Sequence, residues 1–346
     1  MTSKRIVWID WLKLLAIIGV IGIHISSQYL NPEIVFTDIW YEGVVIASTF
    51  RYAIILFIMA SGYLLLRQNQ DIKSIPKRLK RVIIPFSFYL LVYTLVKVII
   101  VWHRTPNILE LLQEICAAIL DPTRISIQFW YVYMIIGLYL VTPILSKWIQ
   151  NSTRREIRII IYIWIALSLL QFTINDTIIP YYLKYLTGPV GYYILGYYLA
   201  TDNNPKLENK KTAILLIITG ILITACGTIL LSLVSCEQSL HFIQLGDITP
   251  GACIEAVGLF LLVKNTDFKG LNTKINNLVT NISKDIYGIY LSNMLIIRLL
   301  EKIGIIPVNA RPILNTTISM ALVIIIAYLL TELMARIPLL RPFSGR

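Results

Sequence analysis

The sequence predicts an all-α fold, a polytopic bundle of membrane-spanning helices, and two observations lead to that class. The 346 residues are 57% apolar and only 14% charged, whereas charged residues make up about 25% of an average soluble domain. Apolar stretches of 17 to 24 residues, long enough to cross a bilayer, occur ten times. We therefore expect a single integral membrane domain over residues 1–346 with about ten transmembrane helices.

The expected spans are separated by short polar loops. They cover residues 8–30, 43–66, 82–102, 128–146, 157–174, 181–200, 212–234, 248–264, 284–302 and 312–334. Between the third and fourth spans, Asn107 to Leu120 has the pattern of a short amphipathic helix lying at the membrane interface. Lys97, near the end of the third span, is expected to extend its ammonium group to that interface.

Lysine and arginine are distributed unequally between the two sides of this bundle. The loops on the side of the N-terminus hold 22 of them and the opposite loops hold five. Short cytoplasmic loops are enriched in these residues, so we expect both termini in the cytoplasm. The net charge of +12 is then a topology signal, and no nucleic-acid partner is expected.

Cysteine and histidine give no sign of a metal centre. The four cysteines show no Cys-x-x-Cys spacing and the three histidines are dispersed, so neither a zinc site nor a haem attachment motif is predicted. We expect no metal and no resident cofactor.

The first span carries three ionisable residues, Asp10, Lys13 and His24. Lys13 and His24 are eleven residues apart, which places both on nearly the same face of a helix, about 16 Å apart along its axis. A charge inside a membrane helix costs at least about 2.5 kcal/mol, so such residues are functional candidates. Two simpler interpretations remain open: Asp10 could pair with Lys13, and His24 could make an interhelical hydrogen bond.

Three further polar residues lie inside later spans. Arg51 enters the second span from outside by about two turns, Glu255 does the same in the eighth, and Asn293 falls near the middle of the ninth. Together with His24 they could converge in an outward-facing polar cavity that serves as an acceptor or oxyanion pocket. Glu255 could alternatively be the salt-bridge partner of Arg51.

A basic run precedes the third span. Arg78 and Arg81 lie three residues apart on one helix face, and guanidinium groups bind phosphate oxygens in a bidentate manner. The run predicts a phosphate site at the inner mouth, with anchoring by the positive-inside rule as the alternative. A base such as His24, whose pKa lies near ambient pH, could activate a hydroxyl on the other side. Group transfer across the membrane and proton-coupled transport both fit these residues.

Six segments in order resemble the acyltransferase 3 family of bacterial integral membrane acyltransferases. They are Asp10-x-x-Lys13 running to His24, Phe50-Arg51 to Ser61-Gly62-Tyr63-Leu64, Arg78-x-x-Arg81 followed by Pro85, Phe129-Trp130-Tyr131 to Tyr139-Leu140-Val141-Thr142-Pro143, Gly191-Tyr192 to Gly196-Tyr197-Tyr198, and Tyr287-Gly288-Ile289-Tyr290-Leu291. The resemblance implies transfer of an acyl group, usually acetyl, from acyl-CoA to hydroxyls of cell-envelope sugars. It implies His24 as the catalytic base, Lys13 as its partner with Asp10 in the same motif, and Arg78 and Arg81 in donor binding.

Two positions depart from the family pattern. Lys13 stands where many members have arginine, which keeps the charge but loses the bidentate fork. Asn293 stands where the similar segment often has histidine, and an amide cannot relay a proton.

We therefore expect a membrane O-acyltransferase of the bacterial cytoplasmic membrane, with acetyl-CoA or another acyl-CoA as co-substrate. Its partners would be the acyl-CoA, an envelope glycan or lipid-linked sugar, and membrane lipid. The transfer could be direct or pass through a covalent acyl-enzyme. The alternative is a transporter or flippase of a glycan or lipid-linked precursor, which predicts transport without acyl-CoA, and a membrane sensor or interaction module ranks third.

Overall fold

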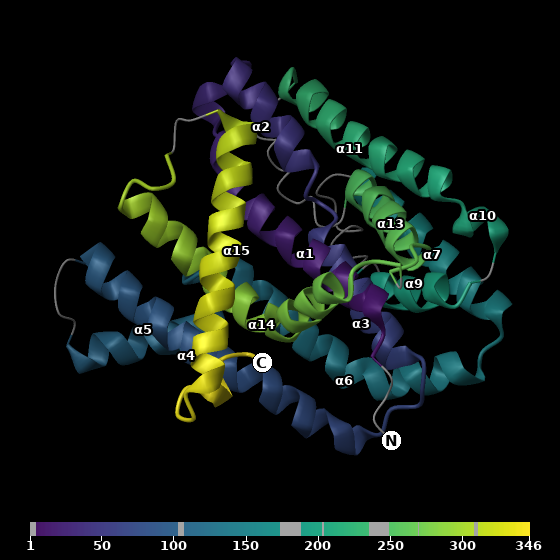
Figure 1. Cartoon of the computed structure of the whole chain (residues 1–346), viewed down its shortest axis with the longest axis horizontal. Coiled ribbons are helices and arrows are strands. Elements are labelled where there is room, and N and C mark those ends of the chain that lie inside the picture. Colours follow the sequence, from purple (N-terminus) through teal and green to yellow (C-terminus); the bar gives the residue numbers. More distant parts are fainter. Residues whose placement is uncertain are drawn as a thin grey trace. The chain divides into compact units, whose positions relative to one another are not determined.

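The computed structural model describes residues 5–102, 107–173, 188–202, 204–234, 249–268, 270–307 and 311–346 (Figure 1). These ranges form helices joined by turns, and no β-strand occurs within them. The prediction of an all-α fold is confirmed. The α-helices are α1 (Val7–Ser26), α2 (Asp38–Ser48), α3 (Ala53–Leu66), α4 (Ile75–Trp102), α5 (Ile108–Leu120), α6 (Trp130–Asn151), α7 (Arg154–Thr173), α9 (Val190–Ala200), α10 (Pro205–Glu208), α11 (Lys210–Ser232), α13 (Pro250–Lys264), α14 (Thr273–Lys302) and α15 (Pro312–Arg336).

Six helical segments of the described chain are long and apolar enough to cross a bilayer. They are Val7–Tyr29, Asp38–Leu66, Ile72–Ile99, Ile127–Asn151, Lys210–Ser232 and Pro312–Arg336. They coincide with the first four, the seventh and the tenth predicted spans. Helices α7, α9, α13 and α14 carry parts of the other four, of which residues 174, 181–187 and 248 lie outside the described ranges. The count of ten and the cytoplasmic location of both termini stay predictions.

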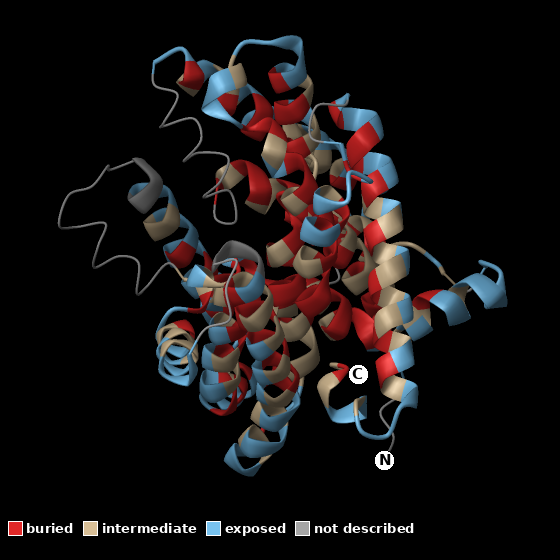
Figure 2. Cartoon of the chain, turned by 90° about the vertical axis from the view of Figure 1, so that its left-hand side faces the viewer, coloured by how far each residue is buried: buried red, intermediate tan, exposed pale blue. Residues whose placement is uncertain are grey.

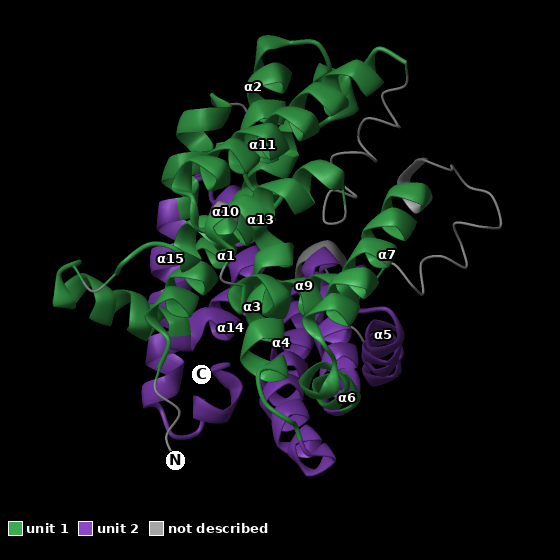
Figure 3. Cartoon of the chain, turned by 90° about the vertical axis from the view of Figure 1, so that its right-hand side faces the viewer, with its two compact units in different colours: residues 1–70, 144–283, 307–320 green, residues 71–143, 284–306, 321–346 purple. Residues whose placement is uncertain are grey.

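The chain divides into two compact units (Figure 3). Unit 1 comprises residues 1–70, 144–283 and 307–320, and unit 2 comprises residues 71–143, 284–306 and 321–346. The candidate residues are divided between them, since Asp10, Lys13, His24, Arg51 and Glu255 belong to unit 1 and Arg78, Arg81 and Asn293 to unit 2.

Two helices of unit 1, α1 and α11, differ in how much of their length is buried; Figure 2 colours the chain by burial. Eleven of the twenty residues of α1 are buried, whereas only six of the 23 residues of α11 are. Those six are all small or hydroxyl-bearing, as expected where one membrane helix packs closely on another. Helix α1 is therefore surrounded by protein, and α11 contacts protein along one stripe.

The stripe on α11 follows a spacing of four residues through Gly220, Thr224, Thr228 and Ser232. Each hydroxyl donates to the carbonyl one turn earlier in the same helix, at distances of 2.7 to 3.1 Å, so no hydroxyl proton is left unsatisfied. A Cβ added to Gly220 would lie 2.6 Å from the backbone oxygen of Gly251. Helices α11 and α13 thus pack nearly backbone to backbone.

Helices α3 and α9 of unit 1 approach each other in the same way. A Cβ on Gly62 would lie 1.9 Å from the backbone oxygen of Tyr193, and a Cβ on Gly196 would lie 2.2 Å from that of Met59. Neither position can hold a side chain without moving a backbone. The two glycines form a reciprocal contact, each lying against the helix that carries the other.

The second predicted span, 43–66, lies within the membrane-length segment Asp38–Leu66, which consists of two helices rather than one. Helix α2 ends at Ser48 and α3 begins at Ala53, with a turn between them. The Ser48 and Thr49 hydroxyls donate to the carbonyls of Val44 and Ile46, both at 2.7 Å. Such bonds compete with the backbone ladder and favour a helix end. Arg51 consequently lies in the break rather than inside a helix.

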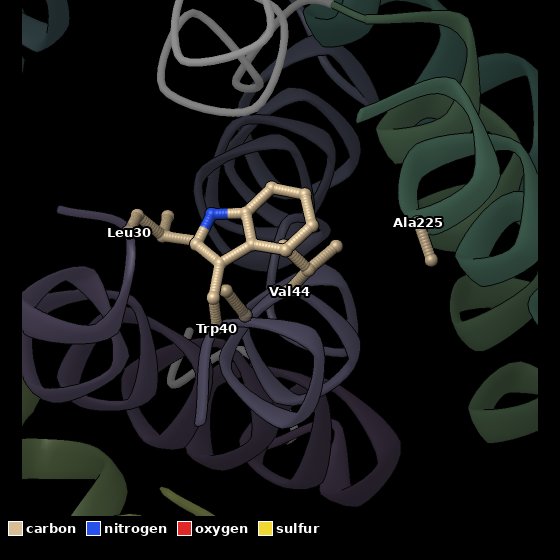
Figure 4. Packing of buried hydrophobic residues seen from close by; sticks show 5 residues of the cluster. Leu30, Trp40, Val44 and Ala225 are labelled. Atoms are coloured by element: carbon tan, nitrogen blue, oxygen red, sulfur yellow. The ribbon is translucent and has the colours of Figure 1, made fainter. Parts of the chain in front are cut away.

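A small apolar cluster holds α2 against α11. Its buried members are Leu30, Trp40, Val44, Ala47 and Ala225, and the Trp40 ring lies between Leu30 and Val44 (Figure 4). Thr37 caps α2, since its Oγ1 accepts from the Trp40 amide at 3.2 Å. The cap and the cluster together fix the direction from which the chain enters the break.

In unit 2, a proline lies inside α4 close to the predicted donor arginines. Pro85 lacks the amide that would bond the carbonyl four residues earlier, which loosens the ladder at this turn. The Tyr287 hydroxyl donates to the neighbouring Val82 carbonyl at 2.9 Å. This bond ties α14 to the first turns of α4.

The C-terminal residues secure the same two helices. Phe343 stacks on Phe88 of α4 with ring centroids 5.0 Å apart. Gly345 has φ +78°, and a Cβ there would lie 2.7 Å from the Gly288 nitrogen of α14. Arg346 Nε lies 3.2 Å from Asp285, whose side chain is fully buried.

Candidate functional site

Asp10 is buried in the first turn of α1 and fully engaged. Its carboxylate accepts from Arg5 Nε at 2.7 Å and Arg5 Nη2 at 3.1 Å, from Ser283 Oγ at 2.7 Å, and from Thr280 Oγ1 at 3.4 Å. The ion-pair partner is therefore Arg5, and the open interpretation that Asp10 pairs with Lys13 is not what the structure contains. A carboxylate with four donors holds α1 against the first part of α14.

Lys13, one turn further along α1, is half-buried and lacks a close partner. No hydrogen bond or ion pair to its ammonium group is found among the residues that the structure describes, and its electrostatic neighbours are Asp10 and Arg5. Because Asp10 is occupied by Arg5, the charge of Lys13 stays available to a ligand.

His24 is half-buried in the last turn of α1. One continuous helix joins it to Lys13, so the eleven-residue spacing does place both on one face, about 16 Å apart. The His24 carbonyl accepts from Ser27 Oγ at 2.8 Å. The helix thus presents a cation near one end and an imidazole near the other.

Arg51 lies at the His24 end of α1. A Cβ on Gly22 would lie 2.6 Å from the Phe50 ring, and one on Gly19 would lie 2.8 Å from the Ala53 Cβ. These contacts bracket Arg51, which is itself 3% exposed. The break between α2 and α3 therefore brings a buried guanidinium group to the helix that carries His24.

Glu255 comes to the same break from α13 and is 1% exposed. Its carboxylate interacts with the backbone amide of Tyr52 and with the charge of Arg51. Tyr52 precedes the first residue of α3, and a negative charge is stabilised at a helix N-terminus. Oxygen Oε2 has no hydrogen-bond partner among the described residues. Glu255 thus retains one acceptor oxygen in a buried polar site.

Arg78 and Arg81 lie on α4 in unit 2, as a pair one turn apart. Both charges act on the hydroxyl of Tyr139 on α6, so the three groups lie within electrostatic range of one another. Lys77, Lys80 and Arg81 are exposed and form no ion pair within the described part of the chain. An anionic ligand can therefore reach this surface without displacing a carboxylate from these three side chains.

A second basic cluster, in unit 1, has a different environment. Arg154 Nη2 donates to the Tyr198 carbonyl at 3.1 Å and pairs with Asp202 at 2.9 Å. Lys264 Nζ donates to the Leu199 carbonyl at 2.9 Å. These cations satisfy carbonyl groups at the C-terminus of α9 and complement its dipole.

Asn293 is fully buried on α14 in unit 2. Its side-chain amide donates to the carbonyls of Ile289 at 3.3 Å and Tyr290 at 2.6 Å. Oδ1 has no partner among the described residues. Asn293 is therefore an acceptor toward any ligand, and its donors belong to its own helix.

Sequence reasoning missed a polar network beside Asn293. The Leu295 amide donates to the Tyr93 hydroxyl at 2.7 Å, and that hydroxyl donates to the Leu291 carbonyl at 3.0 Å. Gln128 Nε2 also reaches the Tyr93 hydroxyl, at 3.2 Å. In a regular helix residues 291 and 295 bond directly, so Tyr93 is inserted into the ladder of α14. The only sequence signal was the polar residue inside an apolar span.

The comparison with protein families decides the class. The model of the acyltransferase 3 family, described as "Acyltransferase domain", matches residues 6–332. The chain belongs to this family. No curated protein and no solved structure matched the chain. Six helical segments of the described residues are long and apolar enough to cross a bilayer, and this family member is therefore a multi-pass membrane acyltransferase, as the six ordered motifs predicted.

Proposed function

We propose that this acyltransferase 3 member is an O-acyltransferase that moves an acyl group, in the simplest case acetyl, from cytosolic acyl-CoA to a sugar hydroxyl. The acceptor would be an envelope glycan or lipid-linked sugar at the bacterial cytoplasmic membrane. The observation that carries the proposal is the charge pattern of α1. Asp10 forms an ion pair with Arg5, whereas Lys13 has no close partner among the described residues and shares a helix face with His24.

Donor binding is assigned to unit 2. Acyl-CoA carries phosphates, and guanidinium groups one helical turn apart bind phosphate oxygens in fork geometry. Arg78 and Arg81 have this spacing, and the Tyr139 hydroxyl lies in the field of both. Lys13, in unit 1, is assigned the binding of an anionic group rather than a contact with His24, because about 16 Å along the axis separates the two and excludes a hydrogen bond between them.

His24 is assigned the role of general base. Its imidazole takes the proton from the acceptor hydroxyl while that oxygen forms a bond to the thioester carbonyl carbon. The carbon–sulfur bond then breaks, and the CoA thiolate takes the proton back from the imidazolium. The products are the sugar ester and free CoA thiol, and the transfer requires neither an oxidant nor a metal.

The break between α2 and α3 is assigned to the acceptor side. Arg51 can stabilise a developing oxyanion, and Glu255 Oε2 can accept a hydrogen bond from a second sugar hydroxyl. Asn293 is left out of the oxyanion site because its amide protons are already bonded to Ile289 and Tyr290. Family membership favours this function over the transporter or flippase, which would run without acyl-CoA.

The test compares envelope glycans by mass spectrometry from cells that contain wild-type protein, His24→Ala or no protein. General bases contribute about 10²- to 10⁴-fold to a rate, so we expect His24→Ala to lose the acyl mass increment as completely as the null. Ser27→Ala is the matched control, because Ser27 is exposed one turn away and its hydroxyl donates to the backbone carbonyl of His24 rather than to the imidazole. Unchanged acylation in His24→Ala at normal protein level would exclude His24 as the base.

A further inference from the structure

Helix α5 of unit 2 is a well-defined helix outside the catalytic assignments. It begins with a capping box, in which Asn107 Oδ1 accepts from the Glu110 amide at 2.8 Å and Glu110 accepts from the Asn107 amide at 3.3 Å. This arrangement fixes the first turn without tertiary help. The predicted amphipathic helix over 107–120 is confirmed as Ile108–Leu120.

Two contacts tie α5 to membrane-spanning helices of the same unit. Glu114 forms an ion pair with Lys97 of α4, and the Tyr133 hydroxyl of α6 donates to the Ile119 carbonyl at 2.7 Å. Lys97 lies five residues before Trp102, the last residue of α4, which is about 7 Å short of the helix end. Helix α5 therefore lies along the flank of α4, where Figure 1 shows it, rather than beyond its end.

One side of α5 is apolar and uncovered. At 100° per residue, six side chains fall within an arc of about 120°, and Glu114 lies on the opposite side of the helix, toward α4. The exposed fractions in the arc reach 79% for Ile108, 53% for Leu112 and 87% for Leu120. Its members are Ile108, Leu109, Leu112, Cys116, Ile119 and Leu120, all exposed.

We propose that α5 is an interfacial helix whose apolar arc is immersed in lipid, in the leaflet at the C-terminal end of α4. A contiguous apolar face of this size is unfavourable in water and marks a contact surface. The arc continues the lipid-facing surface of the spans, where Leu91 and Ile99 of α4 are 43% and 62% exposed. Because the Lys97 pair holds α5 beside α4, lipid is the medium at that depth.

The polar edge of α5 fits the same placement. Gln113 is exposed next to the arc, while Glu110 is engaged in the capping box. Interfacial helices bury their apolar face about 5–10 Å into the headgroup and acyl boundary. The arc thus sits in acyl chains and Gln113 at the headgroups. This inference holds whichever acyl group or acceptor the enzyme uses.

The test measures the accessibility of a nitroxide at Cys116, which is exposed in the arc, in the full chain with the other three cysteines changed to serine. The protein is placed in phosphatidylglycerol and phosphatidylcholine nanodiscs, and collision rates with oxygen and with a neutral nickel chelate are recorded. We expect oxygen collisions to dominate at position 116. A nitroxide at Gln113→Cys, with Cys116→Ser, is the matched control and should collide mainly with the nickel chelate.

Two outcomes would overturn the proposal. Equal nickel access at positions 116 and 113 would place the arc in water, and low access to both reagents at 116 would place it against protein, such as a second copy of the chain. The wild-type chain supplies a measurement free of substitutions. A charged maleimide should leave Cys116 unmodified in nanodiscs and modify it in sodium dodecyl sulfate, and rapid modification in nanodiscs would contradict lipid burial.

Discussion

Two clusters of basic residues, one in each unit, share their charge and differ in what they bind. In unit 1, Arg154 and Lys264 are bonded to carbonyl groups at the end of α9. In unit 2, Lys77, Lys80 and Arg81 form no ion pair among the described residues. The positive-inside rule predicts both clusters equally well. The hydrogen bonds in the structure distinguish the two clusters. Those of Arg154 and Lys264 stabilise the fold, whereas the donors of the unit 2 cluster remain available to a ligand.

The largest expected effect comes from Arg78→Ala combined with Arg81→Ala. Hydrogen bonds to charged groups contribute about 1.5–3 kcal/mol each, so the KM for acetyl-CoA should rise by about 10- to 100-fold or more. The melting temperature is recorded beside the kinetics, because the half-buried Arg78 side chain also makes contacts within the protein. Steady-state kinetics in nanodiscs, together with binding calorimetry on acetyl-CoA, measures the effect.

Unit 1 supplies a matched control for that double variant. Arg155 and Arg158 on α7 are exposed and, like Arg78 and Arg81, three residues apart, so Arg155→Ala with Arg158→Ala removes the same charge at the same spacing. We expect its KM for acetyl-CoA to change less than twofold. If both double variants lose affinity for acetyl-CoA equally, the effect reflects general charge and not a donor site. If neither loses affinity, Arg78 and Arg81 serve only as topology anchors.

An intermediate effect, on stability alone, is expected for Arg154→Ala. The substitution removes one donor from the Tyr198 carbonyl and the ion pair with Asp202, and an exposed ion pair contributes about 0.2–1 kcal/mol. The melting temperature in detergent should fall by about one to three degrees, while the KM for acetyl-CoA stays unchanged. A raised KM at constant melting temperature would reverse the comparison between the clusters.

The smallest effect concerns pH. Burial raises the pKa of Asp202, but the hydrogen bond and charge of Arg154 outweigh it and hold the pKa below its usual value. A depressed carboxylate pKa contributes stability above the pKa of the unfolded state, and that contribution is lost as pH falls through the folded value. The melting-temperature difference between wild type and Asp202→Asn should therefore be present at pH 6 and shrink below about pH 4. A difference that grows on acidification would contradict this assignment.

Local patterns in the sequence predicted the parts of the fold that depend on local physics. The apolar run of the first span predicted 8–30, and α1 covers Val7–Ser26. The amphipathic pattern of 107–120 predicted the bounds of α5 to within one residue. The lysine-histidine face of α1 follows from the same helical geometry, whereas the ion pair between Lys97 and Glu114 was not predicted. Hydropathy and spacing act over neighbouring residues, so they carry this information.

Contacts between distant segments could not be predicted in this way. The Asp10 carboxylate is bound by Arg5, before the helix begins, and by Ser283 on α14, whereas helix spacing suggested Lys13. The insertion of Tyr93 into α14 joins residues about two hundred positions apart. The break between α2 and α3 at residues 49–52 could not be predicted from hydropathy either. The Ser48 and Thr49 hydroxyl bonds that end α2 leave no trace in the hydropathy of the segment.

The reciprocal contact of Gly62 and Gly196 has a consequence for how this fold can be traced in divergent chains. Each glycine lies against a backbone carbonyl of the facing helix, so the two positions constrain each other independently of which acyl group or sugar is handled. Charged residues can change with substrate, but a side chain at either glycine would force α3 and α9 apart. The paired glycines are therefore a marker of architecture, and the charges of α1 and α4 are the marker of chemistry.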